Sequence, residues 1–346
     1  MNLTRGRMRR VTGSYTLIAA AALLTALSAP EVCAQPNPNA DPLNQLMEHR
    51  REMSARAVEE TTQRRFEDRK SDTTFPSDVA NARKSGVLHA LTPEEQKALQ
   101  YNERGMQLFA KGKPDDAIKE YQKAILADPK LAAAHNNLGT GYFALGRFIE
   151  AAAAFSRACE LDTDYGQAFF NLALTQIKLG KQKEANEALD AALRAYNSKG
   201  LAYMKDGRLK EAEEAFRGML QIDPEYTPAL LRLGLVCNAS GRYAEARQNV
   251  RRVVEREPRN SSAHEILAEA LYGEEKYEEA AISAERALKI SPDSTDALYL
   301  AGVARASLGQ RDAALAHLNR LQQLKVADLA QQLSDFINKK APPAKQ

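Results

Sequence analysis

The chain contains no tryptophan, three cysteines and only five histidines among its 346 residues. The histidines are scattered, without metal-ligand spacing to each other or to the cysteines: His49, His89, His135, His264 and His317. No glycine-rich phosphate loop follows a strand, since no convincing strand exists. Nearly all carboxylates fall on helix faces that we expect to be solvated. We therefore expect no enzymatic activity, no metal and no cofactor.

The chain also has little net charge once its first residues are set aside. It carries 48 basic and 45 acidic residues. Residues 1–34 contain four arginines and Glu31, which account for the whole excess of +3 and leave 44 residues of each sign. A neutral remainder has no electrostatic footprint for nucleic acid. We expect no nucleic-acid partner.

Residues 1–34 have the three parts of an export signal. Four arginines precede an apolar run from Tyr15 to Leu27, and the small residue Ala34 follows. Since the run is short for a membrane span, we expect cleavage before Gln35 and no stable membrane insertion afterwards. The alternative is an uncleaved anchor, which would also place the remainder outside the cytoplasm. We expect an exported protein, periplasmic or secreted, of a bacterium.

A frame of small residues recurs along most of the chain. Seven alanines are spaced 34, 34, 27, 34, 34 and 34 residues apart: Ala117, Ala151, Ala185, Ala212, Ala246, Ala280 and Ala314. Twelve residues before each is a small residue that permits close helix packing: Gly105, Gly139, Ala173, Gly200, Gly234, Ala268 and Gly302. Five residues before six of the alanines is a glycine that can end a helix: Gly112, Gly146, Gly180, Gly207, Gly241 and Gly309. In the sixth unit we assign this turn to Gly273. Each unit is therefore predicted to be a helical hairpin.

The second half of each unit has a helical period. Residues four and seven positions after the alanine, such as Tyr121 and Ala124, fall on one helix face, and proline closes four of the units. The frame resembles the tetratricopeptide repeat, whose period is 34 residues with two helices per unit. The resemblance covers residues 98–328 and departs from the family in the lack of tryptophan and in Thr163, where the second repeat should carry proline. It implies an all-α solenoid of about seven helical hairpins.

The frame divides the chain into five parts. We predict a signal peptide at 1–34, a charged helical or flexible tether at 35–91, repeats one to three at 92–192, repeats four to seven at 193–328, and a capping helix with a disordered tail at 329–346. The tether could instead form a coiled pairing with a partner. Thr92 and Glu95 are predicted to form a capping box where the repeats begin. An apolar stripe is predicted to cover the last repeat: Leu329, Leu333, Phe336 and Ile337.

The 27-residue interval breaks the period. Seven residues, about two helical turns, are missing between Ala192 and Gly200, where a turn between repeats would lie. Residues 183–205 contain no proline and one glycine. We predict that the second helix of repeat three continues into the first helix of repeat four, which divides the solenoid into blocks of three and four repeats. The alternative is a kink near Asn197 and Ser198.

The cysteines are not expected to form a disulfide. Cys33 is removed with the signal, and Val32 before it does not fit a lipid-modification motif. Cys159 and Cys237 occupy helix-packing positions two or three repeats apart, beyond the roughly 7 Å limit between their Cα atoms. We interpret both as small buried hydrophobic residues.

The resemblance implies a concave groove, lined mainly by the first helix of each unit, that receives an extended peptide or a partner helix. The residues that it places in the groove are Asn102, Met106, Phe109, Asn136, Thr140, Phe143, Phe170, Leu174, Ile177, Asn197, Leu201 and Met204. We expect asparagines to pair with the peptide backbone and aromatic residues to receive its side chains.

Asn137 and Asn171 repeat at one position and resemble a two-rung form of the asparagine ladder in protein O-glycosyltransferases. The neighbouring units break it with Glu103 and Ser198, and chance is the alternative explanation. The chaperone-binding version of the fold clamps a terminal carboxylate with lysine, asparagine and arginine. The matching positions here carry no cation, which disfavours a heat-shock-chaperone adaptor: Asn102, Met106, Asn137, Gln167 and Asn171.

Charge is concentrated in the later repeats. Six arginines precede six glutamates: Arg242, Arg247, Arg251, Arg252, Arg256 and Arg259, then Glu265, Glu269, Glu274, Glu275, Glu278 and Glu279. We expect salt bridges between adjacent repeats, each worth less than about 1 kcal/mol where exposed. The frame places Glu265 and Glu269 toward the groove, where they could select a basic partner.

These patterns together favour a non-catalytic scaffold that binds a protein or peptide. The alternative is a self-associating structural component of a cell-envelope assembly. An enzyme with an unrecognised site is a more distant alternative.

Overall fold

The computed structural model describes residues 91–340, so the predicted signal peptide, nearly all of the predicted tether and the tail after residue 340 lie outside the described residues. Within 91–340 every regular element is a helix. The first seven are α4 (Pro93–Ala110), α5 (Pro114–Ala127), α6 (Ala132–Ala144), α7 (Phe148–Leu161), α8 (Gly166–Lys178), α9 (Gln182–Lys205) and α10 (Leu209–Ile222). The others are α11 (Thr227–Ala239), α12 (Tyr243–Arg256), α13 (Ser261–Gly273), α14 (Tyr277–Ile290), α15 (Thr295–Ser307), α16 (Arg311–Gln323) and α17 (Ala327–Lys340).

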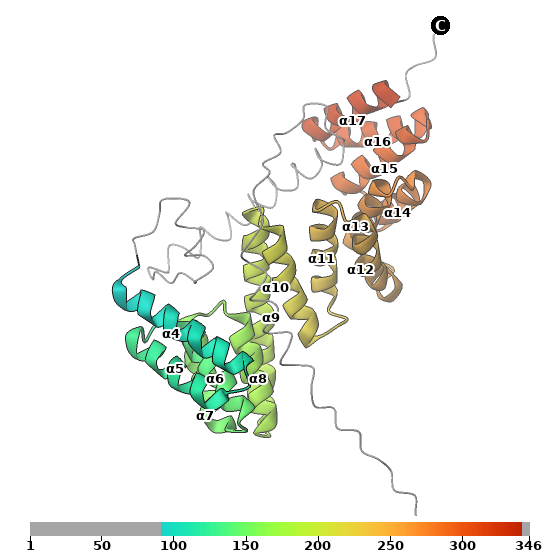
Figure 1. Cartoon of the computed structure of the whole chain (residues 1–346). Coiled ribbons are helices and arrows are strands. Elements are labelled where there is room, and N and C mark those ends of the chain that lie inside the picture. Colours follow the sequence, from blue (N-terminus) through green and yellow to red (C-terminus); the bar gives the residue numbers. More distant parts are fainter. Residues whose placement is uncertain (1–90, 341–346) are drawn as a thin grey trace, which may run out of the picture.

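The helices form a stack of antiparallel hairpins, which confirms the predicted all-α solenoid. In Figure 1 the stack runs from α4 at the lower left to α17 at the upper right. Consecutive helices pack against each other along the whole stack, and no helix of the described residues has both the length and the apolar character needed to cross a membrane.

Glycine sets the close approach of the two helices within a hairpin. A Cβ atom added to Gly139 in α6 would lie 2.7 Å from the ring of Phe155 in α7, too close for any real contact. Gly105 faces Tyr121 in the same way one repeat earlier. The predicted role of the small residue twelve positions before the alanine is therefore confirmed at these sites.

The turn inside the sixth repeat differs from the prediction. Six turn glycines have φ between 71° and 75°, but in the sixth repeat the left-handed residue is Glu275, with φ of 61°. Gly273 is the last residue of α13, and a Cβ atom there would lie 2.5 Å from the ring of Tyr243. The assignment of Gly273 to the turn was wrong because this glycine makes room for a neighbouring aromatic ring, while Glu275 adopts the strained turn conformation.

Helix α9 is continuous over 24 residues, which confirms the predicted fusion across the short interval and excludes the kink near Asn197. Its first half packs against α8 and its second half against α10. Tyr196 lies in the middle: added Cβ atoms on Gly166 of α8 and Gly218 of α10 would come within 2.7 and 2.5 Å of its ring. One side chain thus joins the two blocks.

The predictions for both ends of the solenoid are confirmed. The backbone N–H of Thr92 donates to Glu95 Oε2 (2.7 Å), and that of Glu95 donates to Thr92 Oγ1 (3.2 Å), so the capping box is present. In α17 the four residues of the predicted apolar stripe are buried, and Leu333 contacts Gly302 of α15. Helix α17 therefore covers the last repeat, as expected.

The two described cysteines are buried and free, as predicted. Cys159 lies in α7 and Cys237 in α11. Burial raises the pKa of the Cys159 thiol to about 12, so this sulfur stays protonated and unreactive.

Candidate binding surface

We call the positions predicted to line the groove the first-helix face. In repeats one to four this face is open: Leu174 is 38% exposed and Ile177 is 44% exposed. Eight other predicted residues are half-buried: Met106, Phe109, Thr140, Phe143, Phe170, Asn197, Leu201 and Met204. Thus apolar and aromatic side chains remain partly accessible along α4, α6, α8 and the second half of α9.

A chain of side-chain amides runs across the first three repeats. Asn137 Nδ2 donates to Asn102 Oδ1 of the preceding repeat (2.9 Å). One repeat later, Asn171 Nδ2 donates to Asn136 Oδ1 (2.9 Å). Asn136 Nδ2 lies 3.5 Å from Asn137 Oδ1 and joins the two pairs. Asn102 and Asn136 are buried, at 8% and 5% exposure, so each has found its partners within the protein.

The chain extends to the junction helix. Gln167 Nε2 donates to Asn171 Oδ1 (2.9 Å), and Tyr196 Oη donates to Gln167 Oε1 (3.0 Å). At the other end, Asn102 Nδ2 points to the sulfur of Met106 at 3.8 Å. Every donor in the chain points from α9 toward α4. Hydrogen bonds aligned in this way polarise one another.

The amide chain shows that Asn137 and Asn171 bond to other side chains of the protein. Asn137 and Asn171 do act at equivalent positions, but each bonds to the asparagine of the preceding repeat. A primary amide has two donor hydrogens and two acceptor lone pairs, so both half-buried side chains retain hydrogen-bonding capacity. Their pairing with a peptide backbone stays a prediction. The chain orients these amides before any ligand arrives.

Sequence reasoning named Gln167 only as a position without a cation, and it did not identify Tyr196. Gln167 precedes Asn171 by four residues, a helical spacing that favours such a pair. No sequence signal pointed to Tyr196, because its position depends on the continuous α9. Thr140, predicted to face the groove, donates its hydroxyl to Asn136 O of its own helix (3.0 Å).

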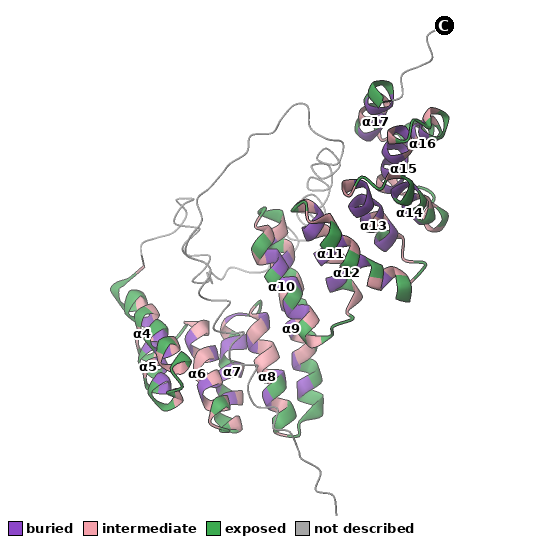
Figure 2. Ribbon diagram, turned by 45° about the vertical axis from the view of Figure 1, so that its right-hand side comes forward, coloured by how far each residue is buried: buried purple, intermediate pink, exposed green. Residues whose placement is uncertain are grey.

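The first-helix face is largely closed in repeats five to seven. The equivalent positions there lie 15, 11 and 8 residues before Ala246, Ala280 and Ala314. Six of these nine positions are buried: Asn238, Glu269, Tyr272, Tyr299, Val303 and Ala306. Figure 2 shows the buried colour covering much of α13 and α15, whereas α4 to α8 are more exposed. The residues at these positions pack into the core of the later repeats.

The prediction that two groove glutamates select a basic partner does not fit this closed face. Glu269 is 1% exposed, so its carboxylate is not open to a ligand. Glu265 is half-buried, and its Oε1 accepts hydrogen bonds from Ser294 (2.7 Å) and Ser261 (3.1 Å). The repeat frame placed both side chains correctly on α13, but packing by neighbouring helices turned the position into an interior one.

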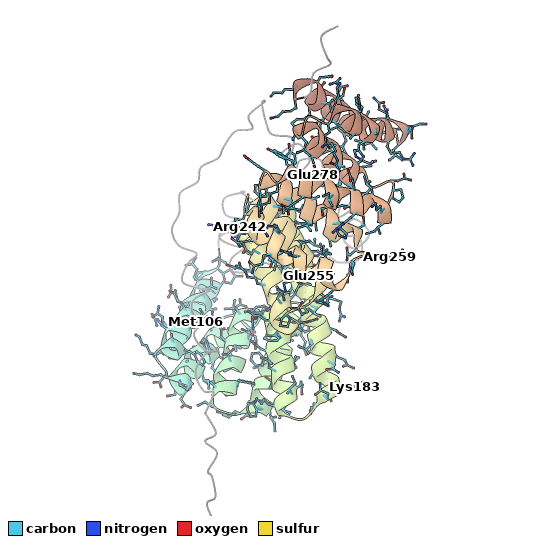
Figure 3. The ribbon with its side chains drawn as sticks, turned by 90° about the vertical axis from the view of Figure 1, so that its right-hand side faces the viewer. Met106, Lys183, Arg242, Glu255, Arg259 and Glu278 are labelled. Carbon is cyan, nitrogen blue, oxygen red and sulfur yellow. The ribbon has the colours of Figure 1, made fainter. Side chains whose placement is uncertain are left out.

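The predicted salt bridges between adjacent repeats are confirmed. Arg242 Nη2 lies 2.6 Å from Glu213 Oε2 in the preceding repeat, and Arg247 Nε lies 2.9 Å from Glu274 in the next. Figure 3 places Arg242, Arg259 and Glu278 on the later repeats, away from Met106 on α4. Four arginines of the cluster form ion pairs between repeats: Arg242, Arg247, Arg252 and Arg256.

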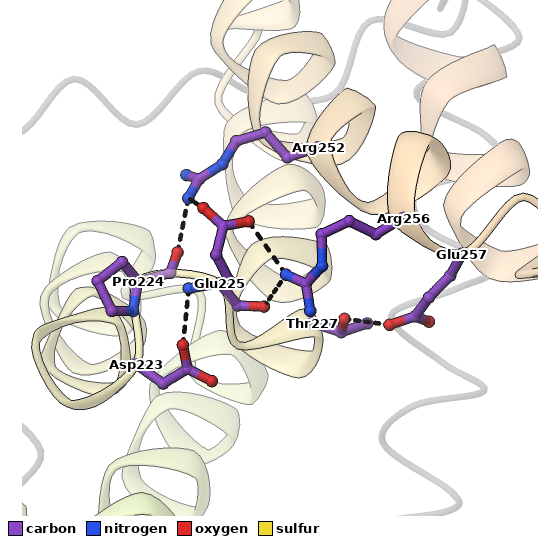
Figure 4. A network of polar contacts seen from close by, with 7 residues as sticks. All are labelled: Asp223, Pro224, Glu225, Thr227, Arg252, Arg256 and Glu257. Atoms are coloured by element: carbon purple, nitrogen blue, oxygen red, sulfur yellow. Dashed lines mark hydrogen bonds and ion pairs between the residues drawn. The ribbon is translucent and has the colours of Figure 1, made fainter.

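Figure 4 shows the most connected of these contacts, at the turn between α10 and α11. Arg252 pairs with the Glu225 carboxylate and donates to Pro224 O (2.6 Å), while Arg256 pairs with the same carboxylate at 3.0 Å. Thr227 donates to Glu257 close by. Hydrogen bonding from Arg252, opposed by desolvation and assisted by Arg256, lowers the pKa of Glu225.

Residues 91–340 contain no group of three or more histidine, cysteine or acidic side chains placed to hold a metal. Two shallow hollows occur on other surfaces, one on α12 and one between α4 and α5, and neither contains a predicted groove residue.

Comparison with known families gives consistent matches. Three family models described as tetratricopeptide repeat match the chain: one at 102–166, 140–199 and 170–227, a second at 203–270 and a third at 296–324. No curated protein matches the sequence.

Several solved structures are similar to the chain. A tetratricopeptide repeat protein from Parabacteroides merdae is 18% identical over 69% of this chain and 99% of its own, with a TM-score of 0.36. PilF of Pseudomonas aeruginosa is 22% identical over 60% and 97%, with a TM-score of 0.38. The second repeat domain of Spaghetti, bound to the HSP90 peptide SRMEEVD, is 30% identical over 29% and 94%, with a TM-score of 0.29. These TM-scores are low, and no functional conclusion follows from them.

Proposed function

Because the chain belongs to the tetratricopeptide-repeat family, we propose that it is a non-catalytic scaffold that binds an extended peptide or a partner helix along the first-helix face of repeats one to four. The observation that carries this proposal is the combination of partly exposed apolar residues with a preorganised chain of amides on that face. Amides can satisfy the backbone of an extended segment, and apolar positions can receive its side chains.

Preorganisation is the physical advantage of this arrangement. A free asparagine side chain must lose rotamer freedom when it binds a ligand, which costs affinity. Asn137 and Asn171 are already held by Asn102 and Asn136, so that cost has been met during folding. The remaining donors and acceptors are presented at a fixed spacing along the solenoid.

We place this function outside the cytoplasm, in a bacterial periplasm or in the medium. The support is the order of basic, apolar and small residues in 1–34. In such a compartment the tether at 35–91 would set the reach of the repeats from whatever holds the amino terminus.

A peptide library tests the proposal. The full chain is expected to bind a subset of random dodecapeptides, and the double variant Asn137→Ala with Asn171→Ala is expected to bind the same peptides at least about tenfold more weakly, since each lost hydrogen bond contributes about 1 kcal/mol. Asn186→Ala serves as a matched control, because Asn186 is exposed on the first half of α9 and pairs only with Gln182 of its own helix.

Two results would contradict the proposal. Unchanged affinity of the double variant would exclude the amide chain from binding, and a chain that binds no peptide but sediments as a stable oligomer would favour the self-associating structural role. A monomer that binds peptides through these residues is the expected outcome.

A further inference from the structure

The third hairpin lacks the helix that covers other hairpins of the stack. Hairpins α4–α5, α6–α7, α11–α12 and α13–α14 each pack against the first helix of the next repeat, and α15–α16 packs against the capping helix α17. For the third hairpin, formed by α8 and the first half of α9, the next first helix is the second half of α9. Because α9 is continuous, its second half cannot fold back over its first half.

Side chains at this end of the third hairpin are more exposed than their equivalents. The residues four positions after the frame alanine are buried in the six other repeats: Tyr121, Phe155, Phe216, Val250, Ala284 and Leu318. In the third repeat this residue is Leu189, and it is half-buried. Leu174 and Ile177 of α8 are exposed. We call Leu174, Ile177 and Leu189 the open end of the third hairpin.

The fifth repeat shows what closes this place elsewhere. A Cβ atom added to Gly234 would lie 2.3 Å from Val250 of its own hairpin and 3.0 Å from Ile266 of the next first helix, so Ile266 closes that pair. The residue at the same place in the frame of the fourth repeat is Ser198, which is small, polar and exposed. The open end therefore lacks the apolar side chain of a covering helix.

A carboxylate beside the open end also lacks its usual contact. In the sixth repeat, the residue five positions after the frame alanine is Glu285, which pairs with Arg305 of the covering helix α15 (2.7 Å). Asp190 holds this place in the third repeat, is exposed, and forms no ion pair with any described residue. In α15 the arginine follows Leu300, which packs in the core of the sixth and seventh repeats, by five positions. A helix that fits the open end should offer the same pair of residues.

We infer that residues 41–53, which lie in the predicted tether and outside the described residues, form a helix that covers the open end. Leu46 would pack on Leu189, and Arg51 would pair with Asp190. This inference goes beyond the proposed peptide binding and does not depend on it.

The sequence of this segment fits the open end. Asp41 followed by Pro42 is a start signal for a helix. Leu43 and Leu46 are three positions apart and would share one helix face. Arg51 follows Leu46 by five positions, which is the spacing of leucine and arginine in α15. The segment thus combines the apolar and basic side chains that the open end lacks.

The segment can also reach the open end. Residues 54–92 join it to α4. A chain of that length without regular structure spans roughly 35 Å, and α4 is separated from α9 by three helix spacings, about 30 Å in all. A linker that matches the span gives an effective concentration in the millimolar range, so even a weak contact is populated. Since Leu174 and Ile177 also belong to the first-helix face, a peptide that reaches them has to displace the segment.

Cysteine pairs in the full chain test the contact. The double variant Leu46→Cys with Leu189→Cys is expected to form its disulfide at least about tenfold faster under mild oxidation than Leu46→Cys with Leu126→Cys. Leu126 is the matched control, because it is 83% exposed on α5 and lies nearer to the tether along the chain. Both variants carry Cys33→Ser, and the described cysteines are buried. Mass spectrometry of the digested chain measures both rates.

A charge swap then tests the ion pair. Arg51→Glu is expected to slow the disulfide between positions 46 and 189 about fivefold, the size of effect that an exposed ion pair gives. Adding Asp190→Arg should restore the rate, because the two charges are then exchanged. Arg69→Glu, further along the same tether, is the matched control and should leave the rate unchanged.

Three results would overturn the inference. The first is equal rates for the pairs with Leu189 and with Leu126, and the second is a rate that Arg51→Glu does not change. The third is a disulfide between two chains, which would show that a second copy covers the open end. Peptide binding through Asn137 and Asn171 is measured separately, so the failure of either proposal leaves the other standing.

Discussion

Repeats one to three and repeats five to seven share one frame, yet they present different surfaces. In the first block, polar contacts between repeats run through amides on the first-helix face, and that face stays open. In the later repeats, several polar contacts between repeats pair arginine with glutamate, and the first-helix face is largely buried. The shared small residues determine how hairpins stack. The residues between them determine whether the first-helix face stays open or is buried by neighbouring helices.

Packing by neighbouring helices explains the closed face. In α15, Tyr299, Leu300 and Val303 are all buried, because α13, α14, α16 and α17 surround this helix. In α8, by contrast, Leu174 and Ile177 remain exposed at equivalent or neighbouring turns. The later repeats therefore enclose the first-helix face, and the earlier ones leave it accessible.

Weakening the packing of the capping helix α17 should give the largest difference in stability between the later and the earlier repeats. Leu333 is fully buried against α15, so Leu333→Ala is expected to lower the free energy of unfolding by about 3 kcal/mol. Because repeats interact mainly with their neighbours, hydrogen exchange should accelerate in α15 to α17 and change little in α4 to α8. Mass spectrometry of exchanging fragments measures this. Equal acceleration in both regions would show that the two blocks unfold as one unit.

Removing the Tyr196 hydroxyl, at the junction of the two blocks, should lower the stability of repeats one to three by a smaller amount. Tyr196→Phe keeps the ring between Gly166 and Gly218 but leaves Gln167 Oε1 without its donor. We expect a loss of about 1 kcal/mol and faster exchange in α8. Tyr121→Phe is a matched control in the first block, since the buried Tyr121 ring also packs against a glycine, Gly105. Equal effects of the two substitutions would mean that the amide chain does not end at Tyr196.

The smallest expected effect concerns pH and the arginine contacts of the later repeats. The pKa of Glu225 is lower in the folded chain than its ordinary value of 4.5, chiefly because Arg252 donates a hydrogen bond to it. A lowered pKa means that the contribution of Glu225 to stability is complete above about pH 4.5 and is lost as the pH falls through the folded value. The difference in melting temperature between wild type and Glu225→Gln should therefore be present at neutral pH and shrink in acid. A difference that stays constant in acid would exclude the ionised carboxylate as its source.

The sequence was sufficient for the fold because the repeat frame depends on local sterics. Glycine against a ring, as at Gly139 and Phe155, leaves a periodic trace that can be counted along the chain. The continuous α9 could also be predicted, since the missing turn and the lack of proline are local features. The prediction for the turn of the sixth repeat was wrong, because Glu275 adopts a left-handed conformation that glycine usually takes.

The surface was harder to predict, because burial depends on neighbours from other repeats. Glu269 occupies a groove position in the frame, but the packing of the later repeats encloses it. Tyr196 joins the amide chain only because α9 carries it back across α8 to Gln167. This contact joins residues almost a full repeat apart, and no single helix pattern reveals it.

The missing turn before repeat four shifts the later hairpins along the axis of α9. An ordinary turn would reverse the chain and start the next hairpin level with the last one. Instead α9 continues in the same direction, so the later stack begins half of this helix further on, roughly 18 Å at 1.5 Å per residue. The two stacks of hairpins are therefore displaced from each other along the axis of α9, and a rigid straight ligand that lies along one stack would not continue along the other.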